Sequence, residues 1–278
     1  MPTVTGRWVE LADGVYARRY AELDLTVGLV VGAERALVVD TRGDAAQGAE
    51  LAAAARARTD LPLLVALTHA HFDHCFGTSA FTGGTDPPPV YAQRGCAPAL
   101  VSSAAAQRAE WVDYYRRRGD PDTAAALAGS PVVPPSHLVE RRVELDLGGR
   151  TVTLLHPGPG HTDHDLVAHV PAAGVLFAGD LVEQGAPPDF TDADPLAWPS
   201  AMDTLLAMAP DTVVPGHGEP VDRAFVAAQR SELDTVATLC RAVADGTLAG
   251  PDAVRASPYP EVATRAALLR VTGTGAPG

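Results

Sequence analysis

The chain has 278 residues, a mass of 28.8 kDa and a formal net charge of −13 at pH 7. Its apolar fraction of 46% and its charged fraction of 20% are typical of a folded globular protein, and the acidic balance weighs against nucleic acid as a substrate. The sequence contains no lysine and no G-x-S-x-G motif, which excludes a lysine Schiff base, a P-loop lysine and a serine nucleophile of the elbow type.

Targeting signals and cysteine pairs are also missing from the sequence. No apolar stretch is long enough to cross a bilayer, and the amino-terminal MPTVTGRWVE has neither the basic start nor the apolar core of a secretion signal. We therefore expect a cytoplasmic protein. The cysteines Cys75, Cys96 and Cys240 form no C-x-x-C pair, which argues against a disulfide framework and against a thiolate zinc site.

The first half of the chain predicts strands that lead into a helix and a further strand. Apolar, β-branched runs at 25–32 and 35–41 predict two strands joined by a turn at 32–34. An Ala-rich segment from Asp44 to about Arg58 predicts a helix, and LPLLVAL at 61–67 predicts a short buried strand that ends at Thr68. The histidine-rich segment that follows is therefore expected in a loop at the end of a strand.

The second half predicts helices, then strands, then helices again. Residues 94–129 predict two or three helices, which we interpret, with the proline-rich stretch that follows, as a lid or insertion at about 94–140. Strands are expected at 141–147, 150–156, 166–170, 174–179 and 211–215, a helix at 195–208, and a long helix at 221–244 that opens a helical carboxy-terminal extension. Two strand-rich halves, each followed by helices, fit one α/β domain over residues 1–278, a four-layered sandwich.

Four potential metal ligands lie within six positions of LTHAHFDHCFG. Alternation along an extended segment places His69 and His71 on the same side, and Asp73 and His74 follow as the chain turns into a helix. Two pairs of ligands can thus face two neighbouring metal ions.

Three further candidates end strands or strand-like runs later in the chain. They are His161 in PGPGHTD, Asp180 in LFAGDL and His217 in VVPGHGEP, each with glycine beside it. Glycine allows close backbone approach and sharp turns at such strand ends. Together the candidates supply five imidazoles and two carboxylates, which suit zinc, iron or manganese. The absence of thiolate ligands argues against a purely structural zinc site, so an open coordination position is expected.

In combination these motifs resemble the metallo-β-lactamase-fold hydrolase superfamily. The resemblance covers about residues 24–230 and rests on H-x-H-x-D-H at 69–74, G-H-T at 160–162, G-D at 179–180 and G-H-G at 216–218. The superfamily includes glyoxalase II-type thioesterases, lactonases and zinc β-lactamases, and the segment around GVLFAGDLV resembles its quinoprotein-relay-associated members. The resemblance implies an αββα sandwich of two mixed β-sheets flanked by helices.

The resemblance also implies how the ligands divide between two Zn2+ ions, with Fe or Mn as alternatives. One ion would be held by His69, His71 and His161, the second by Asp73, His74 and His217, with Asp180 bridging the pair. A hydroxide that bridges the ions would be the nucleophile. Asp73 would have a catalytic role as well, because it could orient the hydroxide or pass its proton to the leaving group. Asp40, at the end of LVVDT, would be a supporting residue rather than a ligand.

From these residues we predict a dinuclear metal-dependent hydrolase acting on a small ester, thioester or lactone-like substrate. Many zinc β-lactamases carry Cys or Ser where this chain has Asp180, which favours the thioesterase and lactonase branches. The alternatives are a β-lactam hydrolase, a mononuclear iron oxygenase like the persulfide dioxygenases, and a fold kept only as a binding scaffold. The expected partner is a small molecule rather than a nucleic acid or a membrane, and a homodimer is left open.

Two sets of side chains near these motifs carry two interpretations each. His164 and Asp165 could support the ligands or contact substrate, or could form a solvent-facing turn. Trp111, Tyr114 and Tyr115 have helical spacing, which is more typical of helix packing than of an aromatic wall over the metal ions.

Overall fold

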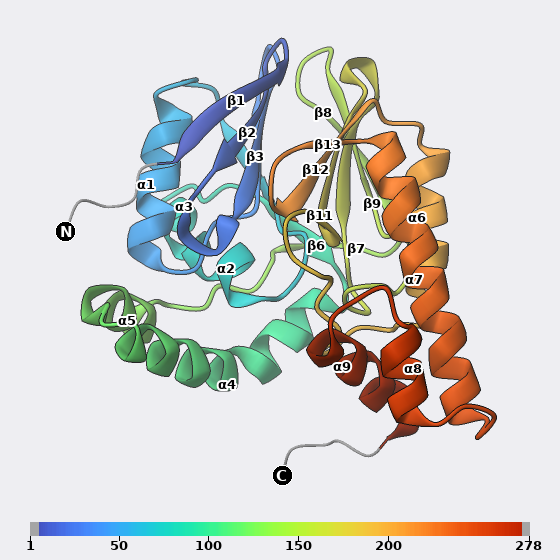
Figure 1. Ribbon diagram of the computed structural model, residues 1–278. Helices are drawn as coiled ribbons and strands as arrows, with labels where there is room; N and C mark the ends of the chain where they lie inside the picture. Colours follow the sequence, from blue (N-terminus) through green and yellow to red (C-terminus); the bar gives the residue numbers. More distant parts are fainter. Residues whose placement is uncertain (1–5, 274–278) are drawn as a thin grey trace.

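The computed structural model describes residues 6–273 (Figure 1). Two β-sheets pack face to face and helices cover their outer faces, which confirms the predicted αββα sandwich. The first five residues, which belong to the segment used above to argue against a secretion signal, lie outside the described residues. Within residues 6–273, no helix combines the length and the apolar character needed to cross a membrane.

The first sheet has seven strands in sequence order. They are β1 (Arg7–Ala12), β2 (Val15–Arg19), β3 (Thr26–Val31), β4 (Ala36–Val39), β5 (Leu63–Ala66), β6 (Val90–Gln93) and β7 (His137–Val139). The pairs from β1 to β4 are antiparallel, and those from β4 to β7 are parallel. The carboxyl ends of β4, β5 and β6 therefore meet at one edge of the sheet.

The second sheet has six strands in the order β13-β12-β11-β10-β9-β8. They are β8 (Arg142–Asp146), β9 (Thr151–Leu155), β10 (Val167–Val170), β11 (Val175–Glu183), β12 (Thr212–His217) and β13 (Val221–Asp222). Only β11 and β12 are parallel, so this sheet is mixed as well. Gly28 in β3 leaves room for the Phe177 ring of β11 between the sheets, because a Cβ at Gly28 would lie 2.4 Å from its Cε1 atom.

The helices fall into two groups along the chain. The first group is α1 (Ala45–Arg56), α2 (Phe72–Cys75), α3 (Ser79–Thr82), α4 (Cys96–Arg117) and α5 (Pro121–Gly129), and the second is α6 (Trp198–Ala207), α7 (Arg223–Ala244), α8 (Gly250–Ala256) and α9 (Glu261–Thr272). Short 3-10 turns occur at η1 (Glu22–Asp24), η2 (Phe76–Thr78) and η3 (Pro171–Ala173). Side chains of Asp44, Asp120 and Asp222 accept backbone N–H groups at the starts of α1, α5 and α7, which fixes where these helices begin.

The sequence prediction missed several elements of the first sheet. The hairpin of β3 and β4 was expected to open the fold, but β1 and β2 precede it. The short strands β6 and β7 were also missed, because their parallel pairing depends on neighbours that are distant in sequence. The long helix was expected from Val221, but this residue pairs with Val213 in β13, so α7 begins at Arg223. The division into a core, an insertion at about 94–140 and an extension from about 221 stays a prediction.

A close contact between two glycines holds the ligand-bearing loop against α1. Gly48 lies inside α1, and a Cβ at this position would lie 2.3 Å from the carbonyl oxygen of Gly77 in η2. The N–H of Gly77 donates to the carbonyl of Arg42 (2.8 Å), and the N–H of Thr41 donates to the carbonyl of His74 (2.7 Å). The backbone that follows α2 is therefore seated directly on the start of the α1 region.

We expect Gly48→Ala to destabilise the fold although alanine is the better helix former. The propensity gain of about 1 kcal/mol is outweighed by overpacking against a backbone oxygen, which typically costs about 1–3 kcal/mol. Urea denaturation followed by circular dichroism measures the change. The matched control is Gly129→Ala in α5, where a Cβ would meet no atom of the described chain within 4 Å. Equal denaturation midpoints for the two variants would contradict the packing argument.

Candidate metal centre

One buried carboxylate organises the loop that follows β5. Asp40, which follows β4, is 2% exposed. Its Oδ1 accepts the N–H of Thr68 (2.7 Å), and its Oδ2 accepts the Thr68 hydroxyl (2.8 Å) and contacts Nδ1 of His74 (2.8 Å). Because β4 and β5 are parallel neighbours, Asp40 and Thr68 leave the sheet side by side. The sequence prediction that Asp40 supports the ligands agrees with this geometry.

The same network orients His69. The Thr68 hydroxyl uses its proton on Asp40, so its oxygen is left to accept from Nδ1 of His69 at 3.0 Å. Likewise the Asp40 carboxylate accepts from Nδ1 of His74. When the outer nitrogen carries the proton, the inner Nε2 of each ring presents a lone pair.

Two more histidines are oriented by acceptors from distant parts of the chain. Nε2 of His71 lies 3.1 Å from Oδ2 of Asp192, and Nδ1 of His217 lies 2.7 Å from the carbonyl oxygen of Leu23. The remaining nitrogens, Nδ1 of His71 and Nε2 of His217, are then the ones that point inward. Sequence reasoning missed Asp192, because it lies in an acidic loop with no recognisable motif.

Four of the predicted ligands form a first group. Nδ1 of His71 lies 3.0 Å from Nε2 of His161, and Oδ2 of Asp180 lies 3.6 Å from Nε2 of both His69 and His161. One potential ligand atom from each of these four residues lies within 4.8 Å of the others. His161 and Asp180 thus join the neighbouring His69 and His71 from distant parts of the sequence.

The other three predicted ligands form a second group beside the first. Nε2 of His217 lies 3.3 Å from Nε2 of His74 and 3.3 Å from Oδ2 of Asp73. The carboxylate of Asp180 reaches this group too, at 3.2 Å from His74 and 3.3 Å from His217. Asp180 therefore lies between the two groups, and the structure brings together all seven residues that the sequence singled out.

Glycines make room for the shared carboxylate. A Cβ at Gly216 would lie 1.8 Å from Oδ1 of Asp180, so the position before His217 has no space for a side chain. Gly179 has φ +56°, and a Cβ there would lie 2.8 Å from Cβ of Thr68. Both glycines were part of the sequence motifs, and each has a steric reason.

The donor set fits a pair of cations. Imidazole nitrogens face each other at 3.0 and 3.3 Å, where two lone pairs repel unless a proton or a metal cation lies between them. Nε2 of His69 and Oδ1 of Asp180 are buried and have no hydrogen-bond partner within residues 6–273. Buried polar atoms without a partner are costly, and cations held by the two groups would satisfy both atoms. Nitrogen and carboxylate ligands without thiolate suit zinc, iron or manganese.

Without metal ions, the histidines divide into neutral and charged rings. Burial and the neighbouring His74 lower the pKa of His69 well below its usual range, and burial lowers the pKa of His161 to about 4. Burial also lowers the pKa of His71, but the hydrogen bond and charge of Asp192 outweigh it and raise this pKa to about 9.

The second group carries opposite charges at neutral pH. Burial is outweighed at His74 and His217 by the negative charge of Asp180, with a contribution from Asp73, so the pKa of each ring rises well above its usual range. Burial would raise the pKa values of Asp73 and Asp180, but the charges of the same two histidines lower both. Protons thus take the place that cations would occupy between these ligands.

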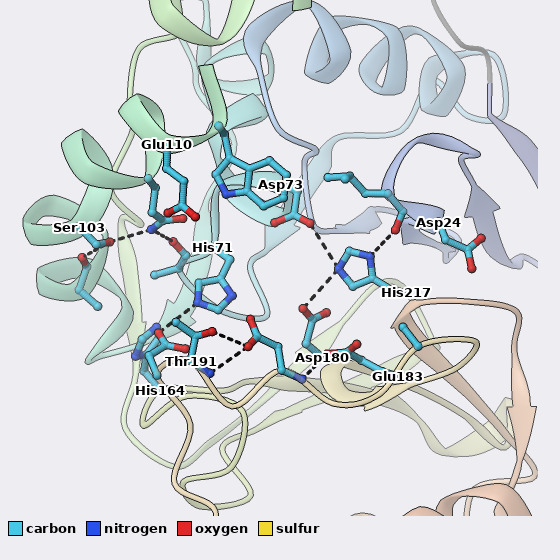
Figure 2. A pocket seen from close by; sticks show the side chains of 18 of the residues that line it. Asp24, His71, Asp73, Ser103, Glu110, His164, Asp180, Glu183, Thr191 and His217 are labelled. Carbon is cyan, nitrogen blue, oxygen red and sulfur yellow. Dashed lines mark hydrogen bonds and ion pairs between the residues drawn. The ribbon is translucent and has the colours of Figure 1, made fainter. Parts of the chain in front are cut away.

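A cavity of about 620 Å³ opens over both groups (Figure 2). Four of the candidate ligands line it, and its walls come from α4, from η1 and from the segment that follows β11. The lining ligands are His71, Asp73, Asp180 and His217. A substrate that enters this cavity would therefore meet both ligand groups at its floor.

The structure decides between the two interpretations of His164 and Asp165 and those of the aromatic residues. His164 and Asp165 are 4% and 3% exposed, so the alternative of a solvent-facing turn is wrong. Asp165 accepts the N–H and hydroxyl of Thr162 (2.9 and 2.7 Å), which fixes the loop that carries His161. Trp111 lines the cavity.

The other two aromatic residues of the predicted set do not face the cavity. Tyr115 is buried, and its hydroxyl donates to Oε1 of Glu22 (2.5 Å). Tyr114 packs against Trp111 and Tyr115. Helix packing, the more typical meaning of this spacing, therefore holds for these two tyrosines, and only Trp111 forms part of a wall.

Comparison with known proteins gives partial matches to several enzymes. The chain is 30% identical to the acyl-coenzyme A thioesterase MBLAC2 of Gallus gallus over 168 residues, 58% of each protein. It is 31% identical to the metallo-beta-lactamase type 2 of Bacteroides fragilis over 118 residues, 38% of this chain and 47% of that protein. The chain spans about half the length of the curated relatives it matches.

Solved structures share the fold at lower identity. A metallo-beta-lactamase from Pontibacter korlensis superposes with a TM-score of 0.64 at 21% identity, over 82% of this chain and 99% of that one. The metallo-beta-lactamase FIM-1 from Pseudomonas aeruginosa, solved in its mono-zinc form, gives a TM-score of 0.65 at 18% identity, over 85% of this chain and 98% of that one.

The family assignment comes from a sequence profile that covers more of the chain than the two enzymes described above do. The profile of the Metallo-beta-lactamase superfamily matches residues 23–217, well over half of the chain, and this range contains all seven candidate ligands. The chain belongs to the metallo-beta-lactamase superfamily of metal-dependent hydrolases.

Proposed function

We propose that the protein is a dinuclear zinc hydrolase that cleaves a small ester, thioester or lactone. The observation that carries the proposal is the pair of adjacent ligand groups that share Asp180 and face one cavity. The partial likeness to an acyl-coenzyme A thioesterase supports a carbonyl substrate.

The proposed ligands are those implied by the sequence motifs. One ion would be held by His69, His71 and His161 and the other by Asp73, His74 and His217, with Asp180 common to both. Two such ions lower the pKa of water toward neutrality and polarise a carbonyl oxygen when they are bound. Iron or manganese would accept the same donors.

Asp73 is the residue that we propose to move a proton during the reaction. It lines the cavity, and the positive charges of His74 and His217 lower its pKa, so it is ionised at neutral pH. An ionised carboxylate at the cavity floor is positioned to take a proton from the attacking water and return it to the leaving oxygen or sulfur.

Hydrolysis of a β-lactam is the second candidate. The observation that favours it is the 31% identity to a metallo-beta-lactamase type 2 over 118 residues. The carboxylate of Asp180, where many zinc β-lactamases carry Cys or Ser, supports the first candidate instead. A mononuclear iron oxygenase would need only one ligand group, whereas this chain keeps both. A cytoplasmic location and the exclusion of nucleic-acid and membrane partners stay predictions.

The shared ligand gives a first test. Chelation should abolish hydrolysis of ester or thioester substrates, and two equivalents of zinc should restore it. Asp180→Ala should bind about one zinc per chain. Its activity should fall by at least about 100-fold, because loss of a residue that only supports the ligands already costs up to that much. Elemental analysis and steady-state kinetics measure both effects. Asp203→Ala, an exposed partner of Arg230, is the control. Full metal content and activity in Asp180→Ala would remove the assignment.

The Asp40 carboxylate gives a second test. Asp40 has φ +66°, a conformation that asparagine tolerates, so Asp40→Asn should keep the backbone. Both oxygens of the carboxylate accept hydrogen bonds from Thr68 and His74, whereas an amide has only one acceptor oxygen. One of these contacts is therefore lost, and zinc affinity should fall about 10- to 100-fold. Competition with a fluorescent chelator measures the dissociation constant. An affinity within twofold of that of Asp203→Asn would show that the carboxylate does not orient the ligands.

The protonation pattern gives a third test. At pH 7 the raised pKa values keep His71, His74 and His217 protonated in the metal-free protein, so zinc must displace these protons. We expect at least three protons to be released per chain when both ions bind. Titration calorimetry in buffers of different ionisation enthalpy counts them. Because the folded-state pKa values are raised, the release should diminish as the pH rises through 9. Release of one proton or fewer at pH 7 would contradict this pattern.

A further inference from the structure

The wall of the cavity is rich in carboxylates and carries no arginine among the described residues. The chain has no lysine, and none of its 21 arginines in residues 6–273 lines the cavity. Besides the ligands, the wall contains five carboxylates, those of Asp24, Glu110, Glu183, Asp189 and Asp192. Figure 2 shows the labelled carboxylates entering from several elements around the opening. Among the described residues, an anionic group on a substrate would find partners of opposite charge only at the ligand groups on the floor of the cavity.

Several of these carboxylates already have a partner. Asp24 forms an ion pair with Arg19, and Asp192 contacts the ring of His71. Arg270 lies near the wall, but it donates to the backbone carbonyls of Asp192 and Ala193. Glu183 is buried, and its Oε1 accepts the N–H of Asp189 at 3.3 Å. Glu110 and Asp189 are the carboxylates left to interact with a ligand.

These two carboxylates are exposed and come from different walls. Glu110 lies on α4 next to Trp111, and within residues 6–273 it forms no hydrogen bond or ion pair. Asp189 lies in the segment after β11, and both donors of Thr191 end on its Oδ1, at 2.9 and 2.6 Å. Its Oδ2 therefore stays available as an acceptor.

A buried imidazole adds an independent observation. His164 lines the cavity and is 4% exposed, and its Nε2 has no hydrogen-bond partner in the described part of the chain. Its Nδ1 lies 2.6 Å from Oδ1 of Asp163, a carboxylate that accepts the ring proton. Burial lowers the pKa of His164, so the ring is neutral and Nε2 is an acceptor. A buried acceptor without a donor indicates a ligand that supplies one.

The hydroxyl donors of the wall are turned toward the protein. The hydroxyls of Ser102 and Ser103 donate to the carbonyl of Ala99 (3.0 and 2.8 Å), and that of Thr191 donates to Asp189. The amide of Gln107 donates to the carbonyl of Ala70 (3.0 Å). Apart from the indole N–H of Trp111 and the side-chain amide of Gln184, the wall therefore offers a ligand mainly acceptors, some of them charged.

We propose that the substrate carries a protonated amine, whose N–H groups bind Nε2 of His164 and the carboxylates of Asp189 and Glu110. The proposal rests on the proposed function, because it places the reacting carbonyl of the same molecule over the ligand groups. Hydrogen bonds between an ammonium group and carboxylates are about twice as strong as neutral ones. Sites built from such groups discriminate against analogues that lack the donor.

Three esters of equal length test the charge preference. They are the phenyl esters of 6-aminohexanoate, heptanoate and pimelate, which end in an ammonium, a methyl and a carboxylate group. With the zinc-loaded protein we expect kcat/KM to be at least about tenfold higher for the ammonium ester than for the methyl ester, and lowest for the carboxylate ester. Equal rates, or a preference for the methyl or carboxylate ester, would overturn the proposal while leaving the hydrolase assignment intact.

Variants then test the named residues. Asp189→Asn, Glu110→Gln and His164→Leu should each lower the ratio of kcat/KM between the ammonium and methyl esters, and Asp189→Arg should invert it in favour of the carboxylate ester. The matched control is Asp113→Asn, one turn from Glu110 on α4, where Asp113 pairs with Arg117 outside the cavity. If the ratio of kcat/KM between the ammonium and methyl esters falls as far in Asp113→Asn as in Glu110→Gln, the role proposed for Glu110 is wrong.

Direct binding separates this proposal from the proposed function. If no ester is hydrolysed, the proposed function fails, and calorimetric titration with hexylammonium and with hexan-1-ol still decides the inference. Tighter binding of hexylammonium, lost in Asp189→Arg, supports an amine site. Binding of hexylammonium no tighter than that of hexan-1-ol overturns it.

Discussion

The site depends on a single buried carboxylate that ties two strand ends together. Asp40 receives three polar contacts from Thr68 and His74, and through Thr68 it also sets the ring of His69. Hydrogen bonds to a charged group contribute about 1.5–3 kcal/mol each. That stabilisation outweighs the left-handed backbone at Asp40 and Arg42, where each such residue costs about 1–3 kcal/mol. Strain at this turn is thus the consequence of aiming one carboxylate at two ligands.

The second sheet completes the site because the two sheets are packed in a fixed register. His161, Asp180 and His217 come from this sheet or from loops beside it, and each must reach ligands that follow β5. The Thr26 hydroxyl donates to the carbonyl of Gly218 (2.7 Å), and the carbonyl of Leu23 receives Nδ1 of His217. These contacts fix the end of β12 against the start of β3. The geometry of the metal centre therefore depends on how the two sheets pack against each other.

The ligands could be predicted from sequence because each lies within or after an apolar strand and has distinctive chemistry, although β11 continues past Asp180 instead of ending before it. The runs before His69, Asp180 and His217 are apolar, and the glycines beside Asp180 and His217 have steric roles that the structure shows. Partners set by tertiary structure could not be predicted. Asp192 is one of many acidic residues in its region, and only the folded chain brings it to His71. For the same reason β6 and β7 were missed, since they are short strands held by parallel neighbours.

The charge of the cavity also bears on how a product would leave. Hydrolysis of an ester or thioester turns a neutral carbonyl group into a carboxylate, and metal ions hold carboxylates well. In this cavity the new anion would share the space with the carboxylates of Glu110, Asp189 and Asp192, with no arginine on the wall among residues 6–273. Repulsion between like charges in a partly desolvated cavity is stronger than in water. For a substrate with the proposed amine on its leaving group, a wall that attracts the amine would therefore also oppose retention of the acid that the reaction forms.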